Sequence, residues 1–277
     1  MTLSARNDFF KGGIILAALS LILIAAGAYV AFPAYPEAEA SAAMRSRGII
    51  QLLIEDSVEP SAYVSFFTML AAVAYSFISI ILINYFFEKT QSPEILFFGL
   101  FVISLSFEFA RIMVPLKTAL SFPAMYLITG SRLLLFGRYF GLFSLFAASI
   151  YAAGLNAQKQ QNAFVVSALS ALVIAMQVPI DILVWDSTLM PWNGYRTMFS
   201  MVEAGILAVT LLTFFISAYT RGSRAYVFIA LGTFLVFIGR NILINSDTWI
   251  TPLPGLLLLV TGTWLISSRL HREYLWL

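Results

Sequence analysis

The chain has no cysteine and only one histidine, His271. Without cysteine, a disulfide, a thiolate metal site and a cysteine nucleophile are all excluded. One histidine cannot supply both ligands of a bis-histidine haem, and it cannot form a histidine-rich metal site. The sequence therefore predicts neither a metal nor another cofactor, and no pattern of residues identifies a catalytic group.

Charged residues are also scarce. They make up 11% of the 277 residues, whereas a soluble domain carries roughly 25%. Hydrophobic residues make up 60%, more than a chain of this length encloses in a water-soluble core. A bilayer accepts such a chain because a spanning helix can be apolar on all sides. The formal net charge of +2 and the lack of a basic run argue against nucleic acid as a partner.

Long apolar stretches recur along the whole chain. At about 1.5 Å of rise per residue, most of them reach across the ~30 Å hydrocarbon core of a bilayer. We predict an all-α, polytopic transmembrane helical bundle with about eight spanning helices, forming a single integral membrane domain over residues 1–277. The predicted helices are 13–32, 62–87, 94–115, 131–154, 163–185, 196–219, 225–245 and 253–268.

Basic residues are biased to one side of these helices, which predicts that both termini lie in the cytoplasm. The first external loop carries mainly acidic residues, including Glu37, Glu55 and Asp56. We expect an integral protein of the bacterial cytoplasmic membrane, with the lipid bilayer as its surroundings. The basic residues on the cytoplasmic side are Arg6, Lys11, Lys89, Lys159, Arg221, Arg224, Arg269 and Arg272.

The first helix has an alternative interpretation as a signal peptide. Arg6 and Lys11 form a basic start, and Ala38-Glu39-Ala40 has the small residues of a cleavage site. The apolar run from Ile14 to Phe32 is longer than a usual signal core, however, and the candidate site lies far beyond it. We therefore favour a retained anchor. Cleavage would leave seven helices.

Two segments between the helices are informative. Residues 41–56 place apolar residues at roughly helical spacing among charged ones, which predicts an amphipathic helix on the external surface. Residues 116–130 lie beside Pro115 and contain Pro123 and Gly130. We expect a bent or partly re-entrant segment there.

Ionisable residues interrupt the predicted spans. A charge near the bilayer centre costs about 2.5–3.5 kcal/mol on insertion scales, so these residues should face one another or water. Counted from the helix ends, they fall in one layer, the outer half of the membrane. They are Glu108, Arg111, Arg132, Arg138, Asp181, Glu203 and Arg240.

Several of these charges share a helix face with other polar residues, so a bundle can turn the polar stripes toward one cavity. The stripes are Ser104, Glu108 and Arg111; Gln177, Asp181 and Trp185; Ser200 and Glu203; and Thr233 and Arg240. The predicted ligand-binding residues are Glu108, Arg111, Arg138, Gln177, Asp181, Glu203 and Arg240.

The charged layer has two interpretations. Arginine suits bidentate contact with a carboxylate or phosphate, which indicates an outward-open pocket for a small anion, a carboxylated metabolite or a lipid headgroup. The same charges would also serve as interhelical salt bridges that hold the bundle together. For Arg132, close to the boundary, we favour snorkelling toward the surface.

Three functions fit the pocket. A ligand-binding sensor or accessory subunit ranks first, and its signal would pass through a membrane or cytoplasmic partner protein. A transporter of a small anion or lipid ranks second, because the charges occupy one half of the bilayer and no helix is clearly broken at the midplane. An intramembrane lipid-modifying enzyme ranks third, with a carboxylate as general base. A purely structural subunit is a further alternative.

Overall fold

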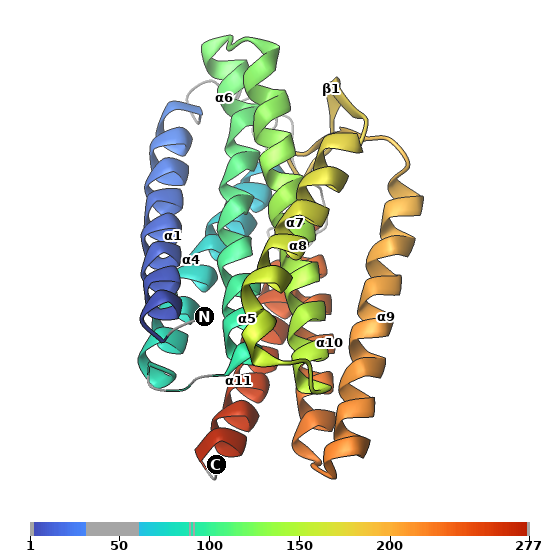
Figure 1. Cartoon of the computed structure of the whole chain (residues 1–277). Coiled ribbons are helices and arrows are strands. Elements are labelled where there is room, and N and C mark those ends of the chain that lie inside the picture. Colours follow the sequence, from blue (N-terminus) through green and yellow to red (C-terminus); the bar gives the residue numbers. More distant parts are fainter. Residues whose placement is uncertain (1–2, 32–60, 89, 91, 276–277) are drawn as a thin grey trace, which may run out of the picture.

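The chain is a multi-pass α-helical membrane protein, and its computed structural model describes residues 3–31, 61–88, 90 and 92–275 (Figure 1). Among these residues, 7 helices are long and apolar enough to cross a membrane. The predicted all-α bundle is confirmed. The elements are α1 Leu3–Ala31, α4 Ala62–Phe86, α5 Pro93–Ser104, η2 Leu105–Ile112, α6 Met113–Leu120, α7 Ala124–Ala152, η3 Ala157–Lys159, α8 Gln160–Gln177, β1 Ile180–Trp185, β2 Pro191–Asn193, α9 Arg196–Arg221, α10 Ala225–Ile244 and α11 Pro252–Leu275.

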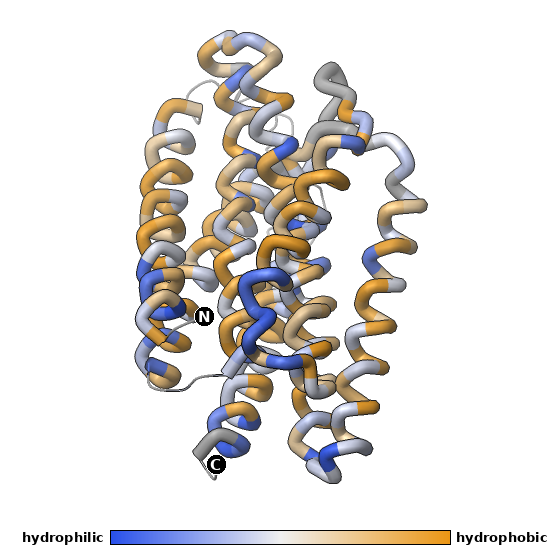
Figure 2. Tube along the Cα trace, in the orientation of Figure 1, coloured by the Kyte–Doolittle hydropathy of each residue, from blue (hydrophilic) through white to orange (hydrophobic). Residues whose placement is uncertain are grey.

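The two ends of the bundle differ in what they carry. The start of α1 and the end of α11 lie at one end, and the α6–α7 turn and the β1–β2 hairpin lie at the other (Figure 1). Figure 2 shows apolar residues along most of each helix and hydrophilic residues at the α7–α8 turn and the end of α11. The amphipathic segment predicted at 41–56 and the possible cleavage site at 38–40 lie outside the described residues.

Several helices extend beyond their predicted bounds because polar residues continue the helix past the apolar run. α1 begins at Leu3 rather than at residue 13, and α11 continues to Leu275 rather than ending at 268. The prediction of a bent or re-entrant segment at 116–130 is wrong. α6 continues to Leu120, and α7 begins at Ala124 after a tight turn in which Ser121 has φ 52°.

A stretch of 3₁₀ helix interrupts the third span. The span is assembled from α5, η2 and α6, and η2 covers Leu105–Ile112. Pro115 follows closely, and its ring has no N–H to donate to the carbonyl of Arg111. A 3₁₀ run of 8 residues is longer than usual, and such a stretch within a helix often marks strain or a functional hinge. The span nevertheless remains one continuous helix over Pro93–Lys117, so the prediction that no helix is clearly broken at the midplane is compatible with it.

The fifth predicted span, 163–185, is correct only in its first part. α8 ends at Gln177, and Ile180–Trp185 instead form strand β1, which pairs antiparallel with β2. Pro179 explains the break, since proline disfavours α conformation at the preceding residue and its ring clashes within a helix. With 18 residues, α8 is about 27 Å long, somewhat less than the hydrocarbon core.

Glycines allow the closest helix packing, between α10 and α11. A Cβ added at Gly239 would lie 2.6 Å from the amide nitrogen of Leu259 and 2.7 Å from the carbonyl oxygen of Gly255. A Cβ at Gly262 would lie 2.7 Å from the carbonyl oxygen of Gly232. The two backbones are therefore in direct contact, as small residues permit inside membranes. This tight pair holds α10, which carries Arg240, in a fixed position.

Candidate functional site

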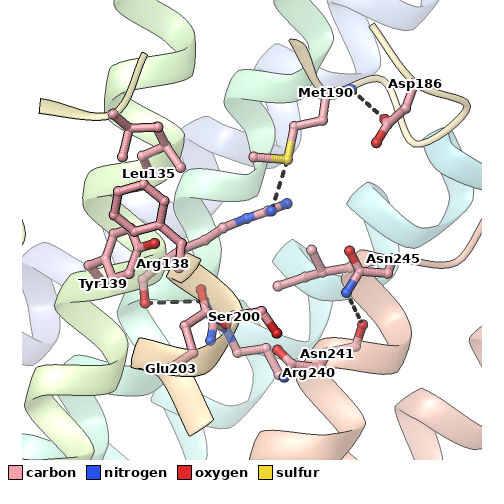
Figure 3. A pocket seen from close by; sticks show the side chains of 13 residues that line it. Leu135, Arg138, Tyr139, Asp186, Met190, Ser200, Glu203, Arg240, Asn241 and Asn245 are labelled. Atoms are coloured by element: carbon pink, nitrogen blue, oxygen red, sulfur yellow. Dashed lines mark hydrogen bonds between the residues drawn. The ribbon is translucent and has the colours of Figure 1, made fainter. Parts of the chain in front are cut away.

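A cavity of about 250 Å³ lies among α7, α9, α10 and the β1–β2 hairpin (Figure 3). It is on the side of the bundle nearer the hairpin, because Arg240 lies in the last part of α10 and Glu203 in the first part of α9. Polar and apolar side chains both contribute to its walls. The lining residues are Leu135, Arg138, Tyr139, Val178, Asp186, Met190, Phe199, Ser200, Glu203, Arg240, Asn241, Ile244 and Asn245.

Glu108 and Arg138 form a two-bond ion pair behind this cavity. Arg138 Nε donates to Glu108 Oε1 at 2.8 Å, and Arg138 Nη2 donates to Oε2 at 3.0 Å. The carboxylate is 2% exposed, so the bonds form in a site that excludes water. Parallel N–H···O bonds of this kind are the strongest arrangement available to an arginine and a carboxylate.

Arg111 is a second arginine close to the same carboxylate. Glu108 and Arg111 are three residues apart in η2, where a 3₁₀ helix aligns positions i and i+3, and Arg111 Nη1 lies 3.7 Å from Glu108 Oε2. The Arg111 guanidinium also donates to the carbonyl of Thr188, with its Nε at 2.9 Å and its Nη2 as a second donor. Arg111 thus ties the interrupted span to the hairpin turn.

Arg240 has a donor with no partner. It is 2% exposed and lines the cavity, and its Nη2 donates to the backbone carbonyl of Arg138 at 3.1 Å. Its Nη1 is buried and has no hydrogen-bond partner among the described residues. A buried charged group without its hydrogen bonds costs several kcal/mol. Arg240 is therefore a buried charged side chain whose hydrogen bonding within the described residues is incomplete.

Glu203 faces the cavity from α9, on the same helix face as Ser200 (Figure 3). It is partly buried, and it forms no hydrogen bond or salt bridge with a residue that the structure describes. Arg240 on α10 and Arg138 on α7 are the cations that act on it electrostatically. Glu203 and Arg240 thus line the same cavity without forming a salt bridge with each other.

The hairpin turn contributes Asp186 and Met190 to the cavity wall. Asp186 Oδ1 accepts hydrogen bonds from Thr188 N at 3.1 Å, Thr188 Oγ1 at 2.6 Å and Met190 N at 3.2 Å. Met190 Sδ in turn accepts from Arg138 Nη1 at 2.9 Å. An aspartate that binds backbone N–H groups two and four residues ahead is a common stabiliser of turns. The turn is therefore held both by its own aspartate and by arginines of the bundle.

The structure brings together five of the seven predicted site residues: Glu108, Arg111, Arg138, Glu203 and Arg240. Gln177 is exposed at the end of α8 and does not line the cavity. Asp181 lies in β1, opposite Trp192, and its side chain is outside the described part. The predicted stripe of Gln177, Asp181 and Trp185 fails because the helix has already ended.

The cavity wall also contains polar residues that were not predicted as site residues. Asp186 enters through the hairpin turn, and Asn241 and Asn245 enter from α10. The two asparagines are four residues apart and follow Arg240 in an apolar helix, a signal that the sequence analysis overlooked. Arg132, expected to snorkel, instead donates from Nη1 to the carbonyl of Ala175 in α8.

A search of the described residues for histidine, cysteine, aspartate and glutamate side chains grouped as metal ligands finds no set of three. Comparison with models of known protein families, with curated proteins and with solved structures finds no match to this chain. The fold and the site together define a multi-pass α-helical membrane protein with a charged cavity between its helices. The role of that cavity follows from its geometry.

Proposed function

We propose that the protein is a ligand-binding sensor or accessory subunit that takes up a small molecule with a carboxylate or phosphate group in the cavity. The observation that carries this proposal is that Arg240 lines the cavity while its buried Nη1 has no hydrogen-bond partner among the described residues. An anionic group placed there would complete the hydrogen bonding of the guanidinium. Charge-assisted hydrogen bonds of this type are about twice as strong as neutral ones.

The charged layer separates into a structural part and a binding part. The carboxylate of Glu108 engages Arg138 and Arg111, so these three side chains serve as a buried salt-bridge network that joins η2, α7 and the hairpin. Arg240 and Glu203 lack such partners among the described residues. The salt-bridge interpretation therefore applies to Glu108, Arg111 and Arg138, and the ligand-pocket interpretation applies to Arg240 and Glu203.

The packing of the bundle between the cavity and the end with the termini favours a ligand-binding role over transport of the ligand across the membrane. Toward the end that carries the termini, the bundle is filled by buried apolar side chains such as Leu142, Leu145 and Val236. The positive-inside rule puts this filled end at the cytoplasmic side of the membrane and the cavity at the external side. A ligand would then arrive from outside, and a partner protein would receive the signal.

The test is the thermal stability of the purified protein in detergent with acetate, succinate, inorganic phosphate, glycerol 3-phosphate, alanine and leucine as probes. At a concentration of 100 times Kd, a bound ligand adds about 2.7 kcal/mol to stability, so the unfolding midpoint should rise by several degrees for at least one probe. Arg240→Gln should abolish that rise. Arg132→Gln removes an arginine of the same layer that lies outside the cavity, and it should leave the rise intact.

Three results would contradict the proposal. One is the lack of a shift with any probe, and a second is a shift that survives in Arg240→Gln. The third is a loss of the shift in Arg132→Gln as large as in Arg240→Gln, since this would show a general response to lost positive charge. Each rise is measured from the variant's own unliganded midpoint, because Arg240 also bonds the Arg138 carbonyl and its loss lowers that midpoint by itself.

A transporter is a second candidate, and η2 is the observation that favours it. Transporters place interrupted helices at their substrate sites, and η2 carries Glu108 and Arg111 next to the cavity. Proteoliposomes with the protein alone decide between the two functions. Uptake of a radiolabelled stabilising probe, absent in Arg240→Gln, would identify a transporter, whereas binding without uptake supports the sensor or accessory subunit.

A further inference from the structure

The cavity offers one cation and one anion to a ligand. Its wall contains two guanidinium groups, but Arg138 is engaged at all three nitrogens, through Glu108 and the sulfur of Met190. The guanidinium with a donor that no described residue accepts from is that of Arg240, at Nη1. On the acidic side, Oδ1 of Asp186 accepts hydrogen bonds within the hairpin turn, whereas Glu203 forms none with a described residue. Arg240 and Glu203 are thus the charges available for recognition.

These two charges do not satisfy each other. Arg240 is on α10 and Glu203 on α9, and no salt bridge joins them although both line the same cavity. Figure 3 shows the two side chains extending from two different helices, with Ser200 beside them. Opposite charges attract strongly in a poorly hydrated site, so a gap between them is suited to a molecule that has both charges.

The balance of formal charge points the same way. A simple anion would add uncompensated negative charge to a set that is already balanced, and burying an uncompensated charge is costly. A zwitterion adds no net charge. The balanced set is Arg111, Arg138 and Arg240 against Glu108, Asp186 and Glu203.

The remaining walls specify the rest of the ligand. Leu135, Val178, Phe199 and Ile244 provide an apolar surface, which fits an aliphatic or aromatic substituent rather than a second polar group. A volume of about 250 Å³ limits the ligand to a small molecule. Asn241 provides an amide within the same wall that can orient it.

We infer that the ligand is a small zwitterion with an apolar side chain, of the α-amino-acid type, whose carboxylate binds Arg240 and whose ammonium binds Glu203. This inference rests on the proposed function, since it names the ligand class of the same cavity. The carboxylate completes the hydrogen bonds of Arg240, and the ammonium donates to Glu203. The side chain lies against the apolar wall.

Matched ligands test both charges separately. Alanine, valine, leucine and phenylalanine are titrated into the detergent-solubilised protein by isothermal calorimetry, each beside its deaminated acid and its decarboxylated amine. For leucine these analogues are 4-methylpentanoate and 3-methylbutylamine. We expect at least one amino acid to bind about tenfold or more tightly than both of its analogues, because each analogue leaves one buried charge of the cavity without a partner.

Two variants should reverse this preference. Glu203→Gln should weaken amino-acid binding by about tenfold or more and strengthen binding of the deaminated acid, because the repelling carboxylate is gone. Arg240→Gln should abolish binding of the deaminated acid. Arg132→Gln, which changes an arginine outside the cavity, should keep the preference of the parent.

Each other outcome overturns the inference. If a deaminated acid binds as tightly as its amino acid, the cavity takes a simple anion; the proposed function then stands and the zwitterion assignment falls. If glycerophosphoethanolamine binds and none of the amino acids does, the cavity holds a lipid headgroup instead. If no compound of any class binds, the zwitterion assignment and the proposed function both fall.

Discussion

Glu108 is paired with two arginines: Arg138 donates two hydrogen bonds to it, of 2.8 and 3.0 Å, and Arg111 lies 3.7 Å from its Oε2. Arg138 comes from α7 and Arg111 from η2, so a single carboxylate compensates charge on two elements of the bundle. The carboxylate and both guanidinium groups have little contact with solvent. This relationship makes Glu108 the centre of the network next to the cavity.

The first prediction concerns Glu108 itself. Glu108→Gln should lower the free energy of unfolding by about 3–5 kcal/mol, because it leaves two buried arginines without their carboxylate. The measurement is the unfolding midpoint in detergent. Asp8→Asn is the control, since Asp8 is exposed on α1 and forms no hydrogen bond or salt bridge with a described residue. Equal midpoints for the two variants would show that the network does not stabilise the bundle.

The second prediction tests the contact between α10 and α11. Gly239→Ala should destabilise the protein by about 1–3 kcal/mol, because the new Cβ would overlap the backbone of Leu259 and Gly255. Gly205→Ala on α9 is the matched control, because a Cβ there meets nothing within 4 Å. Alanine in a helix is favoured over glycine by roughly 0.5–1 kcal/mol, so the control should be neutral or stabilising. Destabilisation of similar size in both variants would contradict the close contact.

The third prediction concerns the attachment of α1. Arg6 is 4% exposed and donates from Nη2 to the carbonyls of Phe87 at 2.7 Å and Glu88 at 2.8 Å, and from Nη1 to that of Thr90. Arg6→Gln should cost about 1.5–3 kcal/mol, as expected for hydrogen bonds to a charged group.

Limited proteolysis provides a local measurement of this attachment. Cleavage at the α4–α5 connection should become faster in Arg6→Gln, because the carbonyls of that connection lose their donor. Lys11→Gln, which changes an exposed residue of the same helix, should behave as the parent. An unchanged cleavage rate in Arg6→Gln would mean that Arg6 does not hold the connection in place.

The fourth prediction is the orientation in the membrane. Because the chain has no cysteine, a single introduced cysteine reports on its own position without interference. Ser187→Cys is in the hairpin turn and Gln158→Cys is at the opposite end, between α7 and α8, and both positions are exposed. A membrane-impermeant maleimide added to intact cells should label Ser187→Cys alone, and permeabilised cells should show labelling of both. The reverse pattern would place both ends of the chain outside.

Much of the architecture was accessible from sequence because the bilayer imposes a simple rule. A spanning segment must satisfy its own backbone hydrogen bonds and present apolar side chains, so apolar runs identify helices directly. The same reasoning placed Glu108, Arg138, Glu203 and Arg240 at a common depth, because a helix rises by a constant ~1.5 Å per residue. Counting residues from the helix ends was therefore enough to predict that these four side chains lie in one layer.

The errors have a common physical origin. The extent of α8 was predicted from hydropathy, which does not distinguish Ile180–Trp185 as a strand from the same residues as a helix, although Pro179 was a signal for the break. The interruption at η2 was also not apparent, since hydropathy is insensitive to a change from α to 3₁₀ hydrogen bonding. The first error altered the site, because Asp181 and Trp185 belong to β1 and not to a continued α8. The second left the pairing of Glu108 with Arg111 unchanged, since residues three apart share a face in either type of helix.

The sequence by itself determined the class of the protein, the approximate number of spans and the depth of the charged layer, because these depend on composition and on regular helix geometry. Which charges pair was decided by the tertiary structure. Arg138 and Arg240 are both arginines in apolar helices, yet one is bound to Glu108 and the other has a free donor in a cavity. The difference depends on helix rotation and on where the hairpin turn folds back, and these are set by contacts between segments far apart in the chain.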